Sequence, residues 1–90
     1  MTSRAVEAAA RLQAMLQDAG IEASRHASSM ILLSGGRLLA TLHVYPDECI
    51  ARIYTPWKRE NIAALERMKT ILEEGCPGRV RVEEAPLHQG

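Results

Sequence analysis

The sequence predicts an α+β fold, a two-layer sandwich in the order helix, three-stranded antiparallel meander, helix and short strand, with both helices on one sheet face. Two observations predict it. Apolar residues recur at helical spacing over residues 3–19 and again over 55–74. Between these segments, residues 27–55 hold three apolar runs separated by turn signals. Ninety residues suffice for one modest core, so we expect 1–90 to be a single domain with 85–90 as a frayed tail.

The first predicted helix begins at a capping residue and ends at a glycine. Thr2 or Ser3 can accept a hydrogen bond from an orphaned amide of the first turn. Gly20 is typical of a helix C-terminus. The apolar stripe of this helix is rich in alanine, which permits close approach to a sheet. Residues 21–26 are ambiguous, and a short strand leading into the meander is one interpretation.

The predicted meander has strands over 27–34, 37–45 and 48–55. Gly35-Gly36 supplies the positive φ of a tight hairpin, and Pro46-Asp47 favours a second turn. Because side chains alternate across a strand, two-residue loops at both turns sort the sheet into two faces. One face is small and aliphatic, and we expect the helices to cover it: Ala27, Ser29, Ile31, Leu33, Leu38, Ala40, Leu42, Val44, Cys49, Ala51, Ile53 and Thr55.

The opposite face of the predicted sheet is mixed, and it carries both tyrosines and two of the three histidines. Its apolar members would form a larger patch than a soluble monomer usually leaves bare. Tyrosine and arginine are also enriched at binding hot spots. We therefore expect a surface that binds another protein or a second copy of the chain, formed by Met30, Leu32, Leu39, His43, Tyr45, Ile50, Arg52 and Tyr54.

The second predicted helix opens at Thr55-Pro56, which is typical of a helix start, and runs to Glu74. The stretch 75–78, rich in glycine and proline, then ends it. Residues 79–84 read Arg-Val-Arg-Val-Glu-Glu, an alternating pattern that predicts a short edge strand. Charges along such a strand guard an open edge against aggregation.

No constellation of residues in the sequence indicates an enzyme. The serines lack a glycine-flanked nucleophile elbow, and no glycine-rich loop could cradle a phosphate. His26 and His43 fall on the mixed face, but zinc normally requires three or four protein ligands at defined spacing. We therefore expect no catalytic residue, no metal and no cofactor.

The cysteines and the N-terminus favour a cytoplasmic location. Cys49 falls on the aliphatic face and Cys76 in a loop; one disulfide is possible by count, but two thiols without a disulfide framework fit a reducing compartment better. Residues 1–4 lead into an amphipathic pattern that is neither a signal peptide nor a membrane span, so we expect no membrane partner. A formal charge of zero argues against a dedicated nucleic-acid binder, because neutralising phosphates usually requires a net basic surface.

The order helix, three strands, helix resembles the double-stranded-RNA-binding domain. Lys58-Arg59 followed by Ala63-Ala64 is similar to the basic, alanine-containing start of the second helix in that family. The resemblance implies an alternative function, weak RNA binding through Lys58 and Arg59. The leading hypothesis is a small non-enzymatic adaptor or inhibitor, of a kind that mobile elements encode, acting through the mixed face. RNA binding would fall steeply with salt, whereas an apolar interface would persist.

Overall fold

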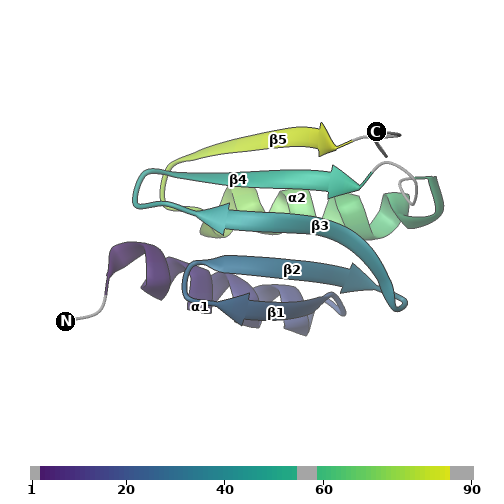
Figure 1. The fold of residues 1–90 in the computed structure, drawn as a ribbon, viewed down its shortest axis with the longest axis horizontal. Coiled ribbons are helices and arrows are strands. Elements are labelled where there is room, and N and C mark those ends of the chain that lie inside the picture. The colour runs from purple at the N-terminus through teal and green to yellow at the C-terminus, as the bar shows by residue number, and fades with distance from the viewer. Residues whose placement is uncertain (1–2, 55–58, 86–90) are drawn as a thin grey trace, which may run out of the picture.

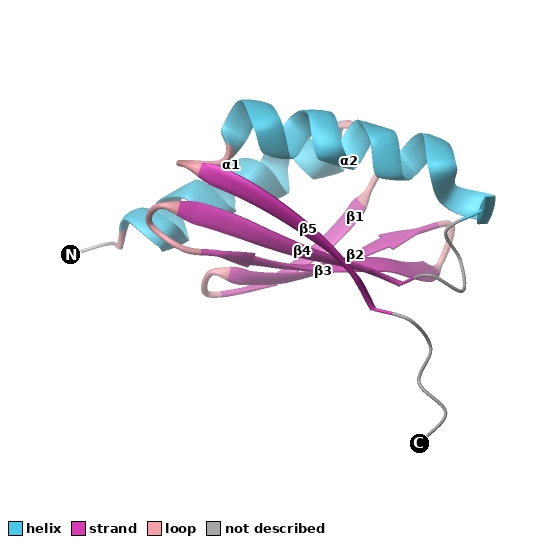
Figure 2. Cartoon of the chain, turned by 90° about the horizontal axis from the view of Figure 1, so that it is seen from above, coloured by secondary structure: helices cyan, strands magenta, loops and turns pink. Residues whose placement is uncertain are grey.

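The computed structural model describes residues 3–54 and 59–85 as two layers, a sheet and a pair of helices (Figure 1). In chain order the elements are α1 Arg4–Asp18, β1 Glu22–His26, β2 Ser29–Ser34, β3 Arg37–Val44, β4 Glu48–Tyr54, the 3-10 turn η2 Arg59–Asn61, α2 Ile62–Gly75 and β5 Arg79–Ala85. The sheet order is β1-β2-β3-β4-β5, in which the first four strands are antiparallel and β5 runs parallel to β4. Both helices lie on the same side of the sheet (Figure 2), which confirms the predicted two-layer α+β fold.

Helix α1 begins and ends where the sequence predicts. The Ser3 hydroxyl accepts a hydrogen bond from the backbone N–H of Val6 at 2.9 Å, which satisfies one orphaned donor of the first turn. Beyond the helix, Gly20 has a φ of +86°, and the backbone N–H of Ile21 donates to the carbonyl of Leu16 at 2.9 Å. The buried residues of the helix are Ala8, Ala9, Leu12 and Leu16.

The ambiguous segment after α1 is a strand of the sheet. β1 pairs antiparallel with β2, and His26 lies opposite Ser29. The two residues between them turn the chain, with Ala27 at a φ of +57°. This left-handed conformation is uncommon for alanine, so the turn carries none of the usual glycine or asparagine signals. The predicted strand over 27–34 is therefore wrong at its start, and the meander has four strands instead of three.

A β-bulge in β3 changes the predicted pairing between β2 and β3. Leu33 pairs with Leu38 as expected, but the next pair is Leu32 with Ala40, which leaves Leu39 as the extra residue. Leu39 and Ala40 are 1% and 0% exposed, so both side chains are buried beneath the helices. Because side chains alternate along a strand, this one-residue shift exchanges the two faces of β2 relative to the prediction.

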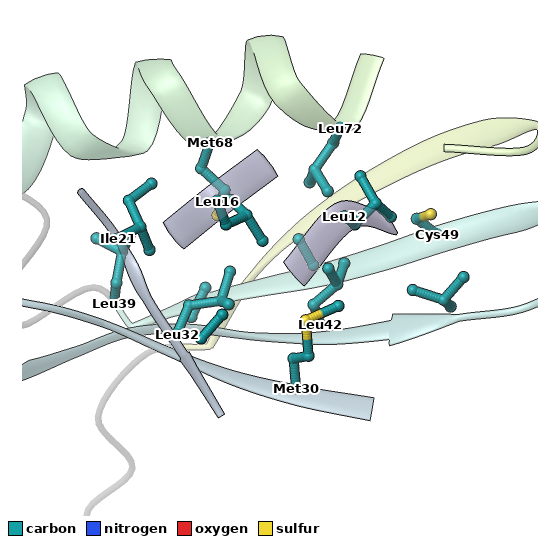
Figure 3. Packing of buried hydrophobic residues seen from close by; sticks show 14 of the residues in the cluster. Leu12, Leu16, Ile21, Met30, Leu32, Leu39, Leu42, Cys49, Met68 and Leu72 are labelled. Carbon is teal, nitrogen blue, oxygen red and sulfur yellow. The ribbon is translucent and has the colours of Figure 1, made fainter. Parts of the chain in front are cut away.

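Three residues that the sequence analysis placed on the open side of the sheet are core residues, and that prediction is wrong. Met30, Leu32 and Leu39 lie in the space between the sheet and the helices (Figure 3), with at most 2% of each side chain exposed. Ile31, which was expected beneath the helices, is 50% exposed. The physical cause is the bulge, which turns Leu32 inward and its neighbour Ile31 outward.

The hairpin of β3 and β4 has the predicted register. Val44 lies opposite Cys49, and Leu42 lies opposite Ala51, all on the face that the helices cover. The core is aliphatic and contains no buried charged or polar residue among the described part of the chain. Its largest fully buried side chains are Leu12, Leu16, Ile21, Leu32, Leu39, Leu42, Ile53, Met68 and Leu72.

Helix α2 crosses back over the sheet and ends one residue past the predicted position. Its expected start at Thr55-Pro56 lies outside the described residues; η2 precedes the regular helix, which begins at Ile62. At its other end, Nη2 of Arg11 donates to the carbonyl of Gly75 at 3.2 Å and so satisfies one of the orphaned acceptors. Gly75 also lies close to α1, where an added Cβ would approach Leu12 Cδ2 to 2.7 Å.

A disulfide joins β4 to the segment between α2 and β5. Cys49 and Cys76 have their Cα atoms 6.1 Å apart, so the expectation of two free thiols is wrong. The crossover brings the start of β5 beside the start of β4, where the N–H of Arg79 donates to the carbonyl of Asp47 at 3.1 Å. Because the cysteines are bonded, they no longer favour a reducing compartment, and a cytoplasmic location stays a prediction. Within the described residues, no helix is long and apolar enough to cross a membrane.

Candidate interaction surface

The sheet face opposite the helices is covered by no described element (Figure 2). We call it the open face. Strand register and side-chain alternation assign the following residues to it: Glu22, Ser24, His26, Ser29, Ile31, Leu33, Leu38, Thr41, His43, Tyr45, Glu48, Ile50, Arg52, Tyr54, Arg79, Arg81 and Glu83. Pairing arranges some of them in rows across the strands. One row runs through His26, Ser29, His43, Ile50 and Arg81.

Five of the eight residues predicted for a binding surface lie on the open face, namely His43, Tyr45, Ile50, Arg52 and Tyr54. The other three are the core residues described above. Their places on this face are taken by Ile31, Leu33 and Leu38, which sequence reasoning had assigned to the helix side. The local signal could not distinguish the two assignments, because residues 30–33 are all apolar and carry no alternation of their own.

Several apolar residues of the open face are partly exposed to solvent. Ile31, Tyr45 and Tyr54 are 50%, 46% and 36% exposed, and Leu33 and Leu38 pair across β2 and β3 with part of each side chain in solvent. Single exposed apolar residues are common on soluble proteins, but several on one sheet face are typical of an interaction surface. Tyrosine adds a large, rigid contact area and a hydroxyl that can bond to a partner.

A hollow of about 230 Å³ opens near the hairpin of β1 and β2, and Ile31, Thr41 and both histidines of the open face contribute to its lining. Within it, Ser29 Oγ and His43 Nδ1 are 3.1 Å apart. A serine and a histidine at this distance could form a nucleophile–base pair if a third group oriented the ring. However, the two residues opposite His43 across the strands are Ser29 and Ile50, and neither is an acid. The described residues also contain no metal-binding group of three or more histidine, cysteine, aspartate or glutamate side chains.

The β5 side of the open face carries a small network of ion pairs. Arg81 Nη2 and Glu83 Oε2 are 2.9 Å apart, and Arg52 Nε lies 3.6 Å from Glu83 Oε1. Arg81 Nη1 also lies 4.0 Å from Glu48 Oε1. More than half of each arginine side chain is exposed, so solvent screens these pairs and each contributes little to stability. The two positive and two negative charges of this network cancel.

The structure describes one of the two basic residues that were predicted as nucleic-acid contacts. Lys58 lies outside the described residues, and Arg59 is an exposed residue of η2. Arg59 belongs to the turn that precedes α2, whereas the open face belongs to the sheet layer on the other side of the molecule (Figure 2). A protein surface and a nucleic-acid contact at these two places would therefore be separate sites.

The fold and this surface define a class, a small α+β sandwich in which five strands carry both helices on one face and present an open, mixed face on the other. Comparison of the chain with protein families, with curated proteins and with solved structures finds no match. The geometry and chemistry of the protein's own residues are therefore the basis for proposing a function.

Proposed function

We propose that this protein is a small non-enzymatic interaction module that binds another protein through its open face. The observation that supports this proposal is that three apolar side chains on that face, Ile31, Tyr45 and Tyr54, are 36–50% exposed. Arg52 lies in the same cross-strand row as Ile31. Tyrosine and arginine are enriched at the energetic centres of protein interfaces. The lack of net charge around them favours a partner surface that is itself apolar and close to neutral.

An adaptor or an inhibitor is the form that this function takes in our proposal, because both act by occupying a surface and need no chemistry. The sequence prediction of a cytoplasmic location belongs to the same proposal. RNA binding through Lys58 and Arg59 stays the alternative. The two differ in salt dependence: phosphate contacts weaken steeply between low and high salt, whereas burial of apolar side chains does not.

Two matched variants test the role of the open face. Ile31→Asp places a charge at the exposed position on β2, and Ala14→Asp makes the same chemical change at an exposed position on α1. Both variants should keep the circular dichroism spectrum of the wild-type protein. Proteins recovered from a lysate of the source cells are then quantified by mass spectrometry for all three chains.

We expect at least one protein to be enriched by the wild-type chain and by Ala14→Asp, and to be lost with Ile31→Asp. Recovery of this protein should persist at high salt. Equal recovery by all three chains would show that the open face is not the binding surface. Recovery of RNA, lost on raising the salt and unaffected by Ile31→Asp, would instead favour the alternative.

A further inference from the structure

The two edges of the sheet differ in how their backbone is protected. At the β1 edge, side chains of α1 reach the strand: the carbonyl of Ala23 accepts hydrogen bonds from Gln13 Nε2 at 2.9 Å and from Gln17 Nε2 at 3.3 Å. Arg25 Nε donates to Gln13 Oε1 at 3.0 Å and extends this cover. Because these side chains occupy a backbone acceptor of β1, a further strand has less to pair with there.

The β5 edge lies at the opposite end of the sheet from these α1 side chains. β5 is the outermost strand (Figure 1) and pairs only with β4 within the described part of the chain. Val82, on the helix side of this strand, is 40% exposed although it belongs to the same face as the core. A seven-residue edge strand with a half-exposed valine is a template for a further strand.

The charged residues of β5 determine which partner strand can pair with its edge, and in which orientation. Its first half is basic, with Arg79 and Arg81, and its second half is acidic, beginning with Glu83. In an antiparallel pair of two identical strands centred on Val82, Arg81 of each copy lies opposite Glu83 of the other copy. The same register places Val82 opposite Val82, on the helix side. A parallel pair would instead bring Arg81 beside Arg81 and Glu83 beside Glu83, and like charges opposite one another are destabilising.

We propose that β5 pairs antiparallel with β5 of a second copy of this chain and forms a twofold-symmetric dimer. Two five-stranded sheets then make one continuous sheet. A twofold axis perpendicular to the sheet keeps the helices of both copies on one side and leaves both open faces on the other. This inference does not depend on the proposed function, because pairing through the strand edge leaves the open face exposed.

Arg81 and Glu83 already form ion pairs within their own chain, and these pairs are compatible with the dimer. Side-chain exposures of 53% and 38% leave room for both residues to add a partner across the edge. The charges of β5 were interpreted above as protection against aggregation. They also restrict the dimer, because they disfavour every register and orientation of the paired strands except those that bring arginine opposite glutamate.

Two charge-reversed variants test the proposal. Arg81→Glu makes β5 acidic at both positions and Glu83→Arg makes it basic at both positions, so each variant places like charges opposite one another in its own dimer. By symmetry each change acts at two pairs, and we expect the dimer dissociation constant to rise about tenfold or more for either variant alone. An equimolar mixture should form a heterodimer, in which the acidic strand of one variant faces the basic strand of the other.

The assay is the solution mass by light scattering over a dilution series, with native mass spectrometry to identify the heterodimer. Mixing leaves the pairs within each chain unchanged, so recovery on mixing reports on contacts between chains. Ile31→Asp serves as the control and should dimerise like the wild-type protein. The proposal is overturned by a wild-type monomer at the highest attainable concentration, by single variants as dimeric as the wild type, or by a mixture that stays monomeric. Loss of the dimer with Ile31→Asp alone would assign self-association to the open face.

Discussion

The Cys49–Cys76 disulfide should contribute substantially to the stability of this chain, and its loss is a direct test of the fold. The cysteines are 27 residues apart in sequence, so the bond closes a loop that contains all of β4 after Glu48 and the whole of α2. In the chain-entropy treatment, closing a loop of this length removes about 12 cal/mol/K from the unfolded ensemble. This corresponds to about 3.5 kcal/mol at 25 °C.

This contribution is a substantial part of the roughly 5–15 kcal/mol that stabilises a domain. For a chain of this size, each kcal/mol moves the melting temperature by about 4–8 °C, so reduction should lower it by about 14–28 °C. The measurement is thermal unfolding followed by circular dichroism, with and without a thiol reductant. Thiol titration and intact mass should report the state of the bond in each sample.

The double variant Cys49→Ala, Cys76→Ala is the control, because its melting temperature should be as low as that of the reduced protein and insensitive to reductant. Two free thiols in protein purified without reductant would show that the bond does not form. Two thiols released by reductant without a change in the melting temperature would show that the cross-link does not stabilise the fold as calculated. Either result would refute the reasoning.

Three further changes test other parts of the structure by chemical denaturation. Leu32→Ala should cost about 2–5 kcal/mol because its side chain is fully buried, whereas Ile31→Ala, one residue away on the open face, should cost less than about 1 kcal/mol; equal costs would contradict the assigned faces. Ser3→Ala should cost about 1 kcal/mol through loss of the helix cap, and Ser3→Asp should retain most of it. Gly78→Ala should destabilise by about 1–3 kcal/mol, because a Cβ there would collide with the backbone carbonyl of Asp47; an unchanged unfolding midpoint would show that the loops separate.

The elements with strong local signals could be predicted from the sequence. Ser3 and Gly20 mark the ends of α1 because capping and positive φ are decided by single residues. Gly35-Gly36 and the turn before Glu48 predicted two hairpins, and the register of β3 against β4 followed from the second. The alternating valines and charges of β5 predicted a strand at the edge of the sheet.

The face of β2 was decided only by the tertiary structure. Residues 30–33 are all apolar, so both phases of the strand satisfy local alternation equally well. The bulge at Leu39 and the packing of Leu32 beneath the helices decide which alternate residues of β2 face the core. Ile31 is consequently exposed on the candidate surface. The disulfide has the same origin, because Cys49 and Cys76 become neighbours only when α2 crosses back and β5 aligns with β4. Local sequence determines those element ends that a cap or a glycine turn marks, whereas contacts between distant segments determine which side chains reach the surface.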